Sequence, residues 1–389
     1  MDHERDLQRC FEMKGMVTGL IMEHSNNVDV INAVFNSKMK TLYRLKFNNS
    51  LQVPSTSFRL CEMLKTNQTL VEIDIMDETE QSVLVNHINI NTKWKQHGIT
   101  IAGGHGQGNQ LNQLNGPEGI YVDDDHQTIY IADSRNHRIV EWKYGAKNGQ
   151  IVAGGNGKGD RSDQLSWPTG VIVNKTNDSL IICDRGNRRV VRWSRQNGKN
   201  GVTIISGISC WGLTMDKNGD LYVSDCGTNE VRRWKQGETK GTIVVGGNGQ
   251  GNDLNQLHCP THIFVDEHHS VYVLDANNHR VMKWLKDAKE GIVVVGRKVE
   301  MNSLTQLSYP CGVIIDHLGT VYVANGTSHR IMRWYKGSKE GSIVVGGNRN
   351  GEQTNQLYYP TGLSFDVKGN LYVVDYSNAR IQKFDIDFD

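Results

Sequence analysis

The segment VLDANNHRVMKW, Val273 to Trp284, recurs in five further versions along a chain of 389 residues. Each copy ends an apolar run in Asp or Asn, passes through a short polar turn, and reaches an aromatic residue nine positions after that Asp or Asn. The other copies are IADSRNHRIVEW, ICDRGNRRVVRW, VSDCGTNEVRRW, VANGTSHRIMRW and VVDYSNARIQKF. Spacings of 41 to 51 residues between copies indicate a repeat architecture.

Each repeat unit contains four short segments of β character. A second apolar run stands upstream of every copy, and a Gly-containing turn followed by another apolar run comes after the aromatic residue in copies one to five. Five of the six upstream runs follow a Pro: Pro117, Pro168, Pro260, Pro310 and Pro360. Four-stranded meanders of this length cannot bury both faces alone, so we predict an all-β fold in which six sheets pack face to face as a six-bladed β-propeller over residues 98–389.

The two ends of the repeat region are complementary. Copy six stops before its fourth strand, whereas GITIAGG, Gly98 to Gly104, stands before copy one without a blade of its own. We expect these N- and C-terminal segments to pair, because pairing removes the sheet edge that an open ring would expose.

The pattern P-x-G-apolar-apolar-apolar-D, followed by Y-V-x-D-x-x-N-x-R, resembles the NHL repeat, and six copies resemble the six-bladed NHL propellers. Propellers of this kind serve as protein-binding, RNA-binding and enzymatic domains, so the resemblance implies the fold and leaves the function open. Some tripartite-motif proteins that end in NHL repeats bind RNA, and they carry RING and B-box domains that this sequence does not contain.

We interpret the repeated turn residues as architecture, because six equivalent copies of one polar set are unlike an active site. The Asp is expected to accept backbone N–H groups of its own turn, the Asn to adopt a left-handed conformation, and the Arg to pair with a carboxylate. The residues concerned are Asp133, Asp184, Asp225, Asp275 and Asp375, with Arg138, Arg189, Arg280, Arg330 and Arg380. The aromatic residue is expected to be buried between blades.

Residues 1–93 form a separate segment of different character. Two L-x-x-L-x-L frames lie 28 residues apart, at Leu42 to Phe47 and at Leu70 to Ile75, and an amphipathic helix is expected within residues 55–68 between them. This arrangement resembles a leucine-rich repeat. A truncated repeat domain, a remnant packed on the propeller and an unrelated α/β segment are the alternatives.

Composition gives no strong indication of a partner. The chain has 43 Lys and Arg against 42 Asp and Glu, no apolar run long enough to span a bilayer, and a charged start in place of a secretory signal. Seven Cys without regular spacing favour reduced thiols, so we expect a cytoplasmic protein. An extracellular protein with an incomplete N-terminus is the alternative, and five N-x-S/T patterns, at Asn48, Asn67, Asn174, Asn177 and Asn325, keep it open.

No catalytic or metal motif is present, and we expect no cofactor. The zinc of the peptidyl-hydroxyglycine lyase propeller is held by His residues, two of them after the Pro of an inner strand. That position here holds Glu118, Thr169, Trp211, Thr261, Cys311 and Thr361, with His262 one residue later. Cys210, Cys259 and Cys311 start consecutive inner strands, and small buried residues near the axis are a better interpretation than a thiolate metal site. His137, His279 and His329 are interpreted as surface turn residues.

One break in the repeat predicts a site. Twelve residues separate the outer strand from the next inner strand in five copies, but in copy three only two lie between Gly207 and Cys210. The shortened loop should leave a notch between blades two and three, bordered by Trp211 and by Arg185 and Arg188 of the neighbouring turn. Packing of Trp211 into the vacated space is the alternative. The sequence favours a non-enzymatic scaffold that binds a protein partner, with RNA binding or a loop-built hydrolase or lyase as alternatives.

Overall fold

The computed structural model describes residues 88–196, 198–296 and 306–388, together with the backbone of three short strands earlier in the chain. The chain divides into two compact units, Met1–His87 and Ile88–Asp389. None of the helices in the described ranges has the length and hydropathy needed to span a bilayer.

The first unit contains a three-stranded parallel sheet of β1 (Leu20–Met22), β2 (Leu45–Asn48) and β3 (Ile73–Met76). Leu45 pairs with Ile73 and Phe47 with Ile75, so the two apolar frames run in register. The helix expected within residues 55–68 lies outside the described residues. The leucine-rich-repeat assignment therefore stays a prediction.

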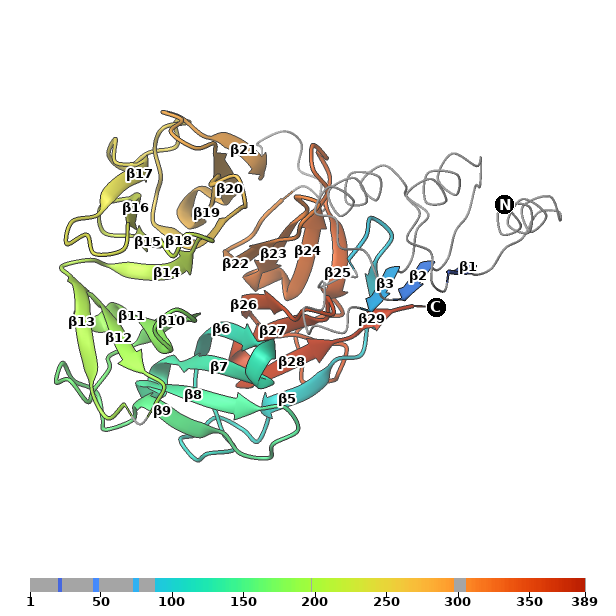
Figure 1. Cartoon of the computed structure of the whole chain (residues 1–389), viewed down its shortest axis with the longest axis horizontal. Coiled ribbons are helices and arrows are strands. Elements are labelled where there is room, and N and C mark those ends of the chain that lie inside the picture. The colour runs from blue at the N-terminus through green and yellow to red at the C-terminus, as the bar shows by residue number, and fades with distance from the viewer. Residues whose placement is uncertain are drawn as a thin grey trace. The chain divides into compact units, whose positions relative to one another are not determined.

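The second unit is an all-β propeller of six four-stranded antiparallel blades, as predicted (Figure 1). Blades one to three are β6–β9 (Pro117–Asp123, Thr128–Asp133, Arg138–Lys143, Gln150–Gly154), β10–β13 (Pro168–Asn174, Ser179–Asp184, Arg189–Ser194, Gly201–Ser206) and β14–β17 (Cys210–Met215, Leu221–Asp225, Glu230–Trp234, Thr242–Gly246). Blades four and five are β18–β21 (Pro260–Val265, Val271–Asp275, Arg280–Trp284, Ile292–Val295) and β22–β25 (Pro310–Ile315, Val321–Asn325, Arg330–Trp334, Ser342–Gly346). Blade six is β26–β28 (Pro360–Phe365, Leu371–Asp375, Arg380–Phe384) with β5 (Ile99–Gly103).

The ring closes through its two ends. Strand β5 pairs antiparallel with β28, with Ile381 opposite Ala102, and Figure 1 shows the light-blue strand beside the red one. A second, short pairing joins β4 (Lys93–Trp94) to β29 (Ile386–Asp387). The predicted closure by β5 is thus confirmed, and the pairing of β4 with β29 extends it to residues that precede β5.

The second strand of each blade is buried at every position, which explains why these strands are apolar without alternation. The repeated aromatic residues are buried as expected: Trp142, Trp193, Trp234, Trp284, Trp334 and Phe384. One cluster joins Tyr130 and Ile139 of blade one to Leu180 and Trp193 of blade two, so the core lies between blades.

The Gly of the P-x-G pattern allows inner strands to approach closely at the axis. A Cβ atom on Gly119 would lie 2.5 Å from the carbonyl oxygen of Thr169, and one on Gly362 would lie 2.6 Å from that of Glu118. In blade four His262 occupies the equivalent position. This substitution distinguishes the contact between blades four and five from the other contacts around the ring.

Candidate functional site

The turn after the second strand of each blade, together with the loop before the next inner strand, forms one face of the propeller. Short 3₁₀ helices shape five of these turns: η2 (Ser134–Asn136), η3 (Arg185–Asn187), η4 (Ala276–Asn278), η5 (Gly326–Ser328) and η6 (Tyr376–Asn378). A further one, η1 (Asp124–His126), follows the first strand of blade one. Backbone hydrogen bonds such as Gly186 N–H to Ser166 O tie turn and loop together. We call the surface formed by residues 134–137, 185–188, 226–229, 276–279, 326–329 and 376–379 and the adjoining loops the turn face.

The repeat Asp accepts hydrogen bonds from other donors than the prediction gave. Asp133 Oδ1 accepts the N–H of Asn115, 2.7 Å away in the preceding loop, and Oδ2 accepts Asn136 Nδ2 and Arg138 Nε. The expected bond from the turn backbone forms only in blade three, where Asp225 accepts the N–H of Gly227. In blades one, two, four and six the Asn and Arg side chains of the turn donate to the Asp instead. In blade five the repeat position is Asn325, whose Oδ1 accepts the N–H of Ser308.

The turn Asn was expected to be left-handed, but in five blades the left-handed residue is another one. It lies four positions after the repeat Asp or Asn: His137, Arg188, His279, His329 and Ala379. In blade three this position is Asn229. The predicted Arg–carboxylate pairs are confirmed at 2.7 Å for Arg138, Arg189, Arg280 and Arg380. Arg330 faces Asn325 in place of an Asp, because blade five carries an amide at the repeat position.

The turn histidines contact the next blade, so surface placement describes them incompletely. His137 Nδ1 accepts the N–H of Trp167 at 3.2 Å, and the two rings meet edge to face. His279 makes the same ring contact with Tyr309. Trp167 and Tyr309 have left-handed backbones, with φ of 49° and 48°, and are 40% and 61% exposed. The structure therefore holds large aromatic side chains at the surface in a conformation that bulky residues rarely adopt.

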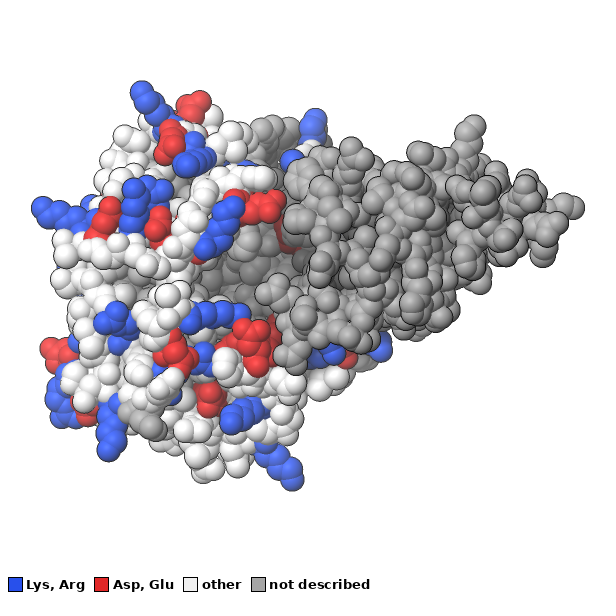
Figure 2. All heavy atoms as spheres, viewed as in Figure 1, with Lys and Arg blue, Asp and Glu red and all other residues white. Residues whose placement is uncertain are grey.

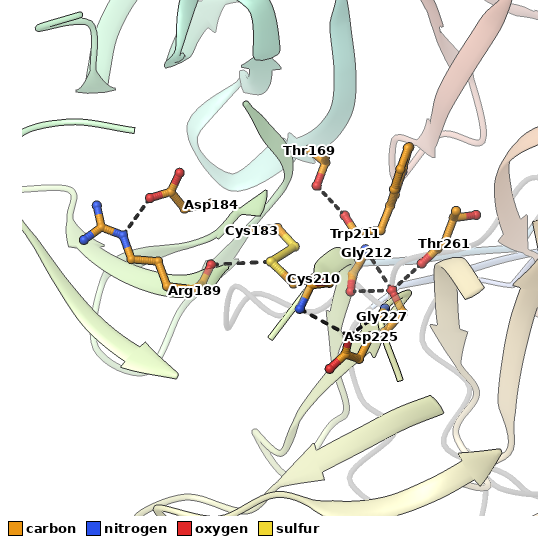
Figure 3. The surroundings of a disulfide bond; sticks show 12 residues. Thr169, Cys183, Asp184, Arg189, Cys210, Trp211, Gly212, Asp225, Gly227 and Thr261 are labelled. Carbon is orange, nitrogen blue, oxygen red and sulfur yellow. Dashed lines mark hydrogen bonds and ion pairs between the residues drawn. A yellow bond between two sulfur atoms is a disulfide. The ribbon is translucent and has the colours of Figure 1, made fainter. Parts of the chain in front are cut away.

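The cysteines contradict the expectation of reduced thiols. Cys183 is bonded to Cys210, which links blade two to blade three (Figure 3). Cys226 is bonded to Cys259, which links blade three to blade four. The thiol cluster considered for a metal therefore does not exist, and only Cys311 is a free thiol within the described ranges. Spacing along the chain could not give these pairs, because each joins residues brought together by blade packing.

A pocket lies on the turn face where the connection is short. Its volume is about 560 Å³, and its wall consists of Trp167, Arg185, Gly186, Ser209, Cys226 and Gly227. Both disulfides adjoin it, since Cys226 is in the wall and Cys210 begins the strand beside Ser209. The position agrees with the notch expected between blades two and three.

Two of the three predicted site residues come together here. The guanidinium carbon of Arg185 lies 3.9 Å from the centre of the Trp211 ring. Trp211 is partly buried, and its carbonyl accepts the hydroxyl of Thr169 at 2.7 Å (Figure 3). Arg188 is exposed and does not join them; its backbone carbonyl accepts the N–H of Ile208, which fixes the shortened loop.

The sequence reasoning missed Glu118 as a site residue. It is the only acidic residue among the six that follow the start of an inner strand, a signal that aligning the copies gives. Burial raises the pKa of its carboxyl to about 7, against the opposing effect of Arg185 and Arg135. The carboxylate makes no hydrogen bond or ion pair with any residue that the structure describes.

Two further polar groups near the axis differ from the repeat. Burial lowers the pKa of His262 to about 4, and its Nδ1 has no hydrogen-bond partner within the described part of the chain. Burial also raises the pKa of the Cys311 thiol to about 12, so this thiol is protonated at neutral pH. In residues 88–388, apart from the undescribed positions, no three His, Cys, Asp or Glu side chains gather as a metal site.

Comparison with known proteins identifies the repeat. A model of the NHL repeat matches residues 114–142, 209–234 and 357–384, which lie in blades one, three and six. The chain therefore carries NHL repeats, folded as a six-bladed β-propeller. No curated protein sequence matches it.

Several solved structures share the fold. An auxiliary nutrient-binding protein from Bacteroides thetaiotaomicron is 16% identical with a TM-score of 0.59, over 76% of this chain and 77% of that one. A protein of unknown function from the same organism is also 16% identical, with a TM-score of 0.58 over 76% and 77% of the two chains. A gluconolactonase from Xanthomonas campestris is 11% identical with a TM-score of 0.54, over 76% and 97%. At such identities the likeness establishes the fold alone.

Proposed function

We propose that this propeller is a non-enzymatic binding scaffold that presents its turn face to a protein partner. The observation that carries the proposal is the Arg185–Trp211 stack beside the pocket between blades two and three. Arg and Trp are enriched in interface hot spots, and a guanidinium already stacked on a ring loses little conformational freedom when it binds. The exposed rings of Trp167 and Tyr309 add rigid apolar contact area to the same face.

Charge distribution supports a protein partner over RNA. Among the described residues of the face that Figure 2 displays, basic and acidic side chains are interspersed and form no continuous basic patch. The net charge of the chain is +1. Nucleic acid binding depends on several cations placed along a phosphate backbone, which an interspersed surface does not offer.

The two disulfides support a site of action in an oxidising compartment, in place of the cytoplasmic location expected from the sequence. Each joins neighbouring blades, and Cys226 is in the pocket wall. A protein exported to such a compartment would keep the pocket wall covalently fixed.

The test replaces Arg185, Trp211 and Arg188 together by Ala and uses Arg192→Ala, an exposed residue of the same blade, as the control. Both variants and the wild type are immobilised, and captured proteins from source cells are quantified by mass spectrometry. We expect a partner that the wild type and Arg192→Ala retain and that the triple variant loses at unchanged melting temperature.

Retained capture with a sharp fall in melting temperature would instead show that Trp211 only packs the space left by the short loop. Single-stranded RNA is titrated in parallel at several salt concentrations. Tight, salt-sensitive RNA binding lost in the triple variant would replace the protein partner with RNA.

A further inference from the structure

Arg185 differs from the repeat arginines in having its hydrogen-bonding groups free. Arg280, in the repeat position, donates Nε to Asp275, Nη1 to the carbonyl of Asn252, and Nη2 to the carbonyls of Asp253 and Gln256. The side chain of Arg185 makes no hydrogen bond or ion pair with any described residue, and only its backbone carbonyl is used, by the N–H of Arg188. Its contact with the Trp211 ring restricts the guanidinium and leaves its N–H groups available to an acceptor.

The pocket beside this guanidinium favours an acidic ligand. Its volume of about 560 Å³ is in the range of binding sites for small ligands or peptide side chains. Of the six wall residues, Arg185 is the only charged one. Trp167, 40% exposed, offers an apolar surface beside it, and the backbone of Gly186 and Gly227 completes the wall.

We propose that the pocket between blades two and three binds a carboxylate of an acidic peptide segment, with Arg185 as its bidentate partner and Trp167 packing against the neighbouring residue. This inference rests on the proposed function and specifies the chemistry of the partner. A carboxylate fits better than a nucleic acid backbone, because a single guanidinium matches one planar anion, whereas nucleic acid binding needs several cations along a row of phosphates.

Glu118 couples this site to pH. Arg185 from η3 and Arg135 from η2 act on its carboxyl, and Glu118 in turn raises the pKa of three groups that face it: Cys311 from β22, Tyr359 from the loop before β26, and Tyr376 from η6. A ligand carboxylate on Arg185 adds a negative charge and competes for the same cation. Binding therefore favours protonated Glu118.

The sign of the pH dependence follows from this competition. The pKa of Glu118 is about 7 in the free protein and rises when the ligand is bound. Affinity then increases as pH falls from the bound-state pKa toward about 7, by at most about tenfold per unit for one proton, and levels off below about 7, while a peptide carboxyl with a pKa of about 4 stays ionised.

The experiment selects heptapeptides from a random displayed library on the full chain at about pH 6, a unit below the Glu118 pKa. The strongest peptide is synthesised with blocked termini, with each acid replaced by its amide, and with a free C-terminal carboxylate. Fluorescence anisotropy then gives Kd at about pH 6 and about pH 8. The two acid-bearing forms separate a side-chain carboxylate from a chain terminus, and an oligouridylate of similar length is the nucleic acid probe.

We expect selected peptides to be acidic and to lose at least about tenfold in affinity on amide replacement or with Arg185→Ala. Arg185→Lys should recover only part of the loss, since an ammonium cannot form the bidentate contact. Arg192→Ala should bind as the wild type does. The wild type should bind several-fold tighter at the lower pH, and Glu118→Gln should remove that difference.

Peptides without acidic residues, or affinity that Arg185→Ala leaves unchanged in a variant with wild-type melting, would overturn the proposal. So would oligouridylate binding that depends on Arg185. A captured protein partner that the triple variant loses, combined with no carboxylate preference, would leave the proposed function standing and reject only this ligand. Carboxylate binding without any captured partner would support this ligand and reject the proposed function.

Discussion

Arg380 of the last blade pairs with Gly103 of β5, so residues at opposite ends of the propeller unit share one sheet. Deleting residues 1–104 removes β5 and leaves β28 as an open apolar edge. We expect aggregation or a large fall in melting temperature for that deletion. Deleting residues 1–87 keeps both β4 and β5, and should leave the propeller folded. Equal melting temperatures of the two deletions, measured by differential scanning fluorimetry, would contradict closure.

Trp94 should contribute strongly to propeller stability although it precedes the blades. It is 2% exposed, packs on Phe365 and Tyr322, and donates its Nε1–H to the carbonyl of Gly369 at 3.0 Å. We expect Trp94→Ala to lower the free energy of unfolding by about 3–5 kcal/mol. Leu285→Ala, at a side chain 52% exposed, is the control and should change it by less than about 1 kcal/mol. Denaturant unfolding measures both variants. A small loss of unfolding free energy in Trp94→Ala would show that this segment does not contribute to the core.

The disulfides predict a thiol count. At most three of the seven Cys should react with a thiol reagent in the unfolded, unreduced protein, and all seven after reduction. Loops of 27 and 33 residues give about 3–4 kcal/mol of stabilisation per bond by loop-closure entropy. Reduction should therefore lower the melting temperature markedly. Seven reactive thiols in protein purified without reductant would show that the bonds do not form.

Close approach at the axis makes two equivalent glycines unequal. A Cβ on Gly312 would overlap the carbonyl oxygen of Thr361, whereas one on Gly170 would lie 3.3 Å from that of Trp211. We expect Gly312→Ala to cost about 2–3 kcal/mol and Gly170→Ala about 1 kcal/mol or less, because backbone cannot move aside as a flexible side chain can. The comparison uses chemical denaturation, and similar losses would mean that the spacing of inner strands is uniform.

His262 should make the fold sensitive to mild acid. Its pKa is about 4 in the folded chain and 6.5 ordinarily, so below pH 6.5 the unfolded chain binds a proton that the folded chain does not. Stability then falls with pH by up to about 1.4 kcal/mol per unit until about pH 4. His262→Gly should reduce the loss between about pH 7 and about pH 5 by about 2 kcal/mol.

The exposed His268 provides the comparison for this acid sensitivity, with a side chain that is 80% accessible. His268→Asn should follow the wild type at both pH values. The result to look for is a difference between the two variants in the pH dependence of urea unfolding. If His262→Gly retains the full loss of stability, other groups must bind the proton.

The sequence determined the blades. Six copies of one strand–turn–strand pattern, with an unpaired strand at the start and a missing one at the end, were enough to predict blade number, strand content and closure. The buried Trp284 and its counterparts, and the Arg280–Asp275 pair, followed from the same repeats. These features are set within one repeat or by its edges, so a local pattern encodes them.

The tertiary structure alone decided the rest, because it depends on distances between residues of different blades. The carboxylate of Asp133 accepts the backbone N–H of Asn115 in the preceding loop, and Cys183 is bonded to Cys210 of the next blade. The short loop after Gly207 predicted a notch, but only blade packing stacked Arg185 on Trp211 and brought it within electrostatic reach of Glu118. A repeat pattern fixes what each blade is, whereas the contacts between unlike residues of adjacent blades arise only when the ring has closed.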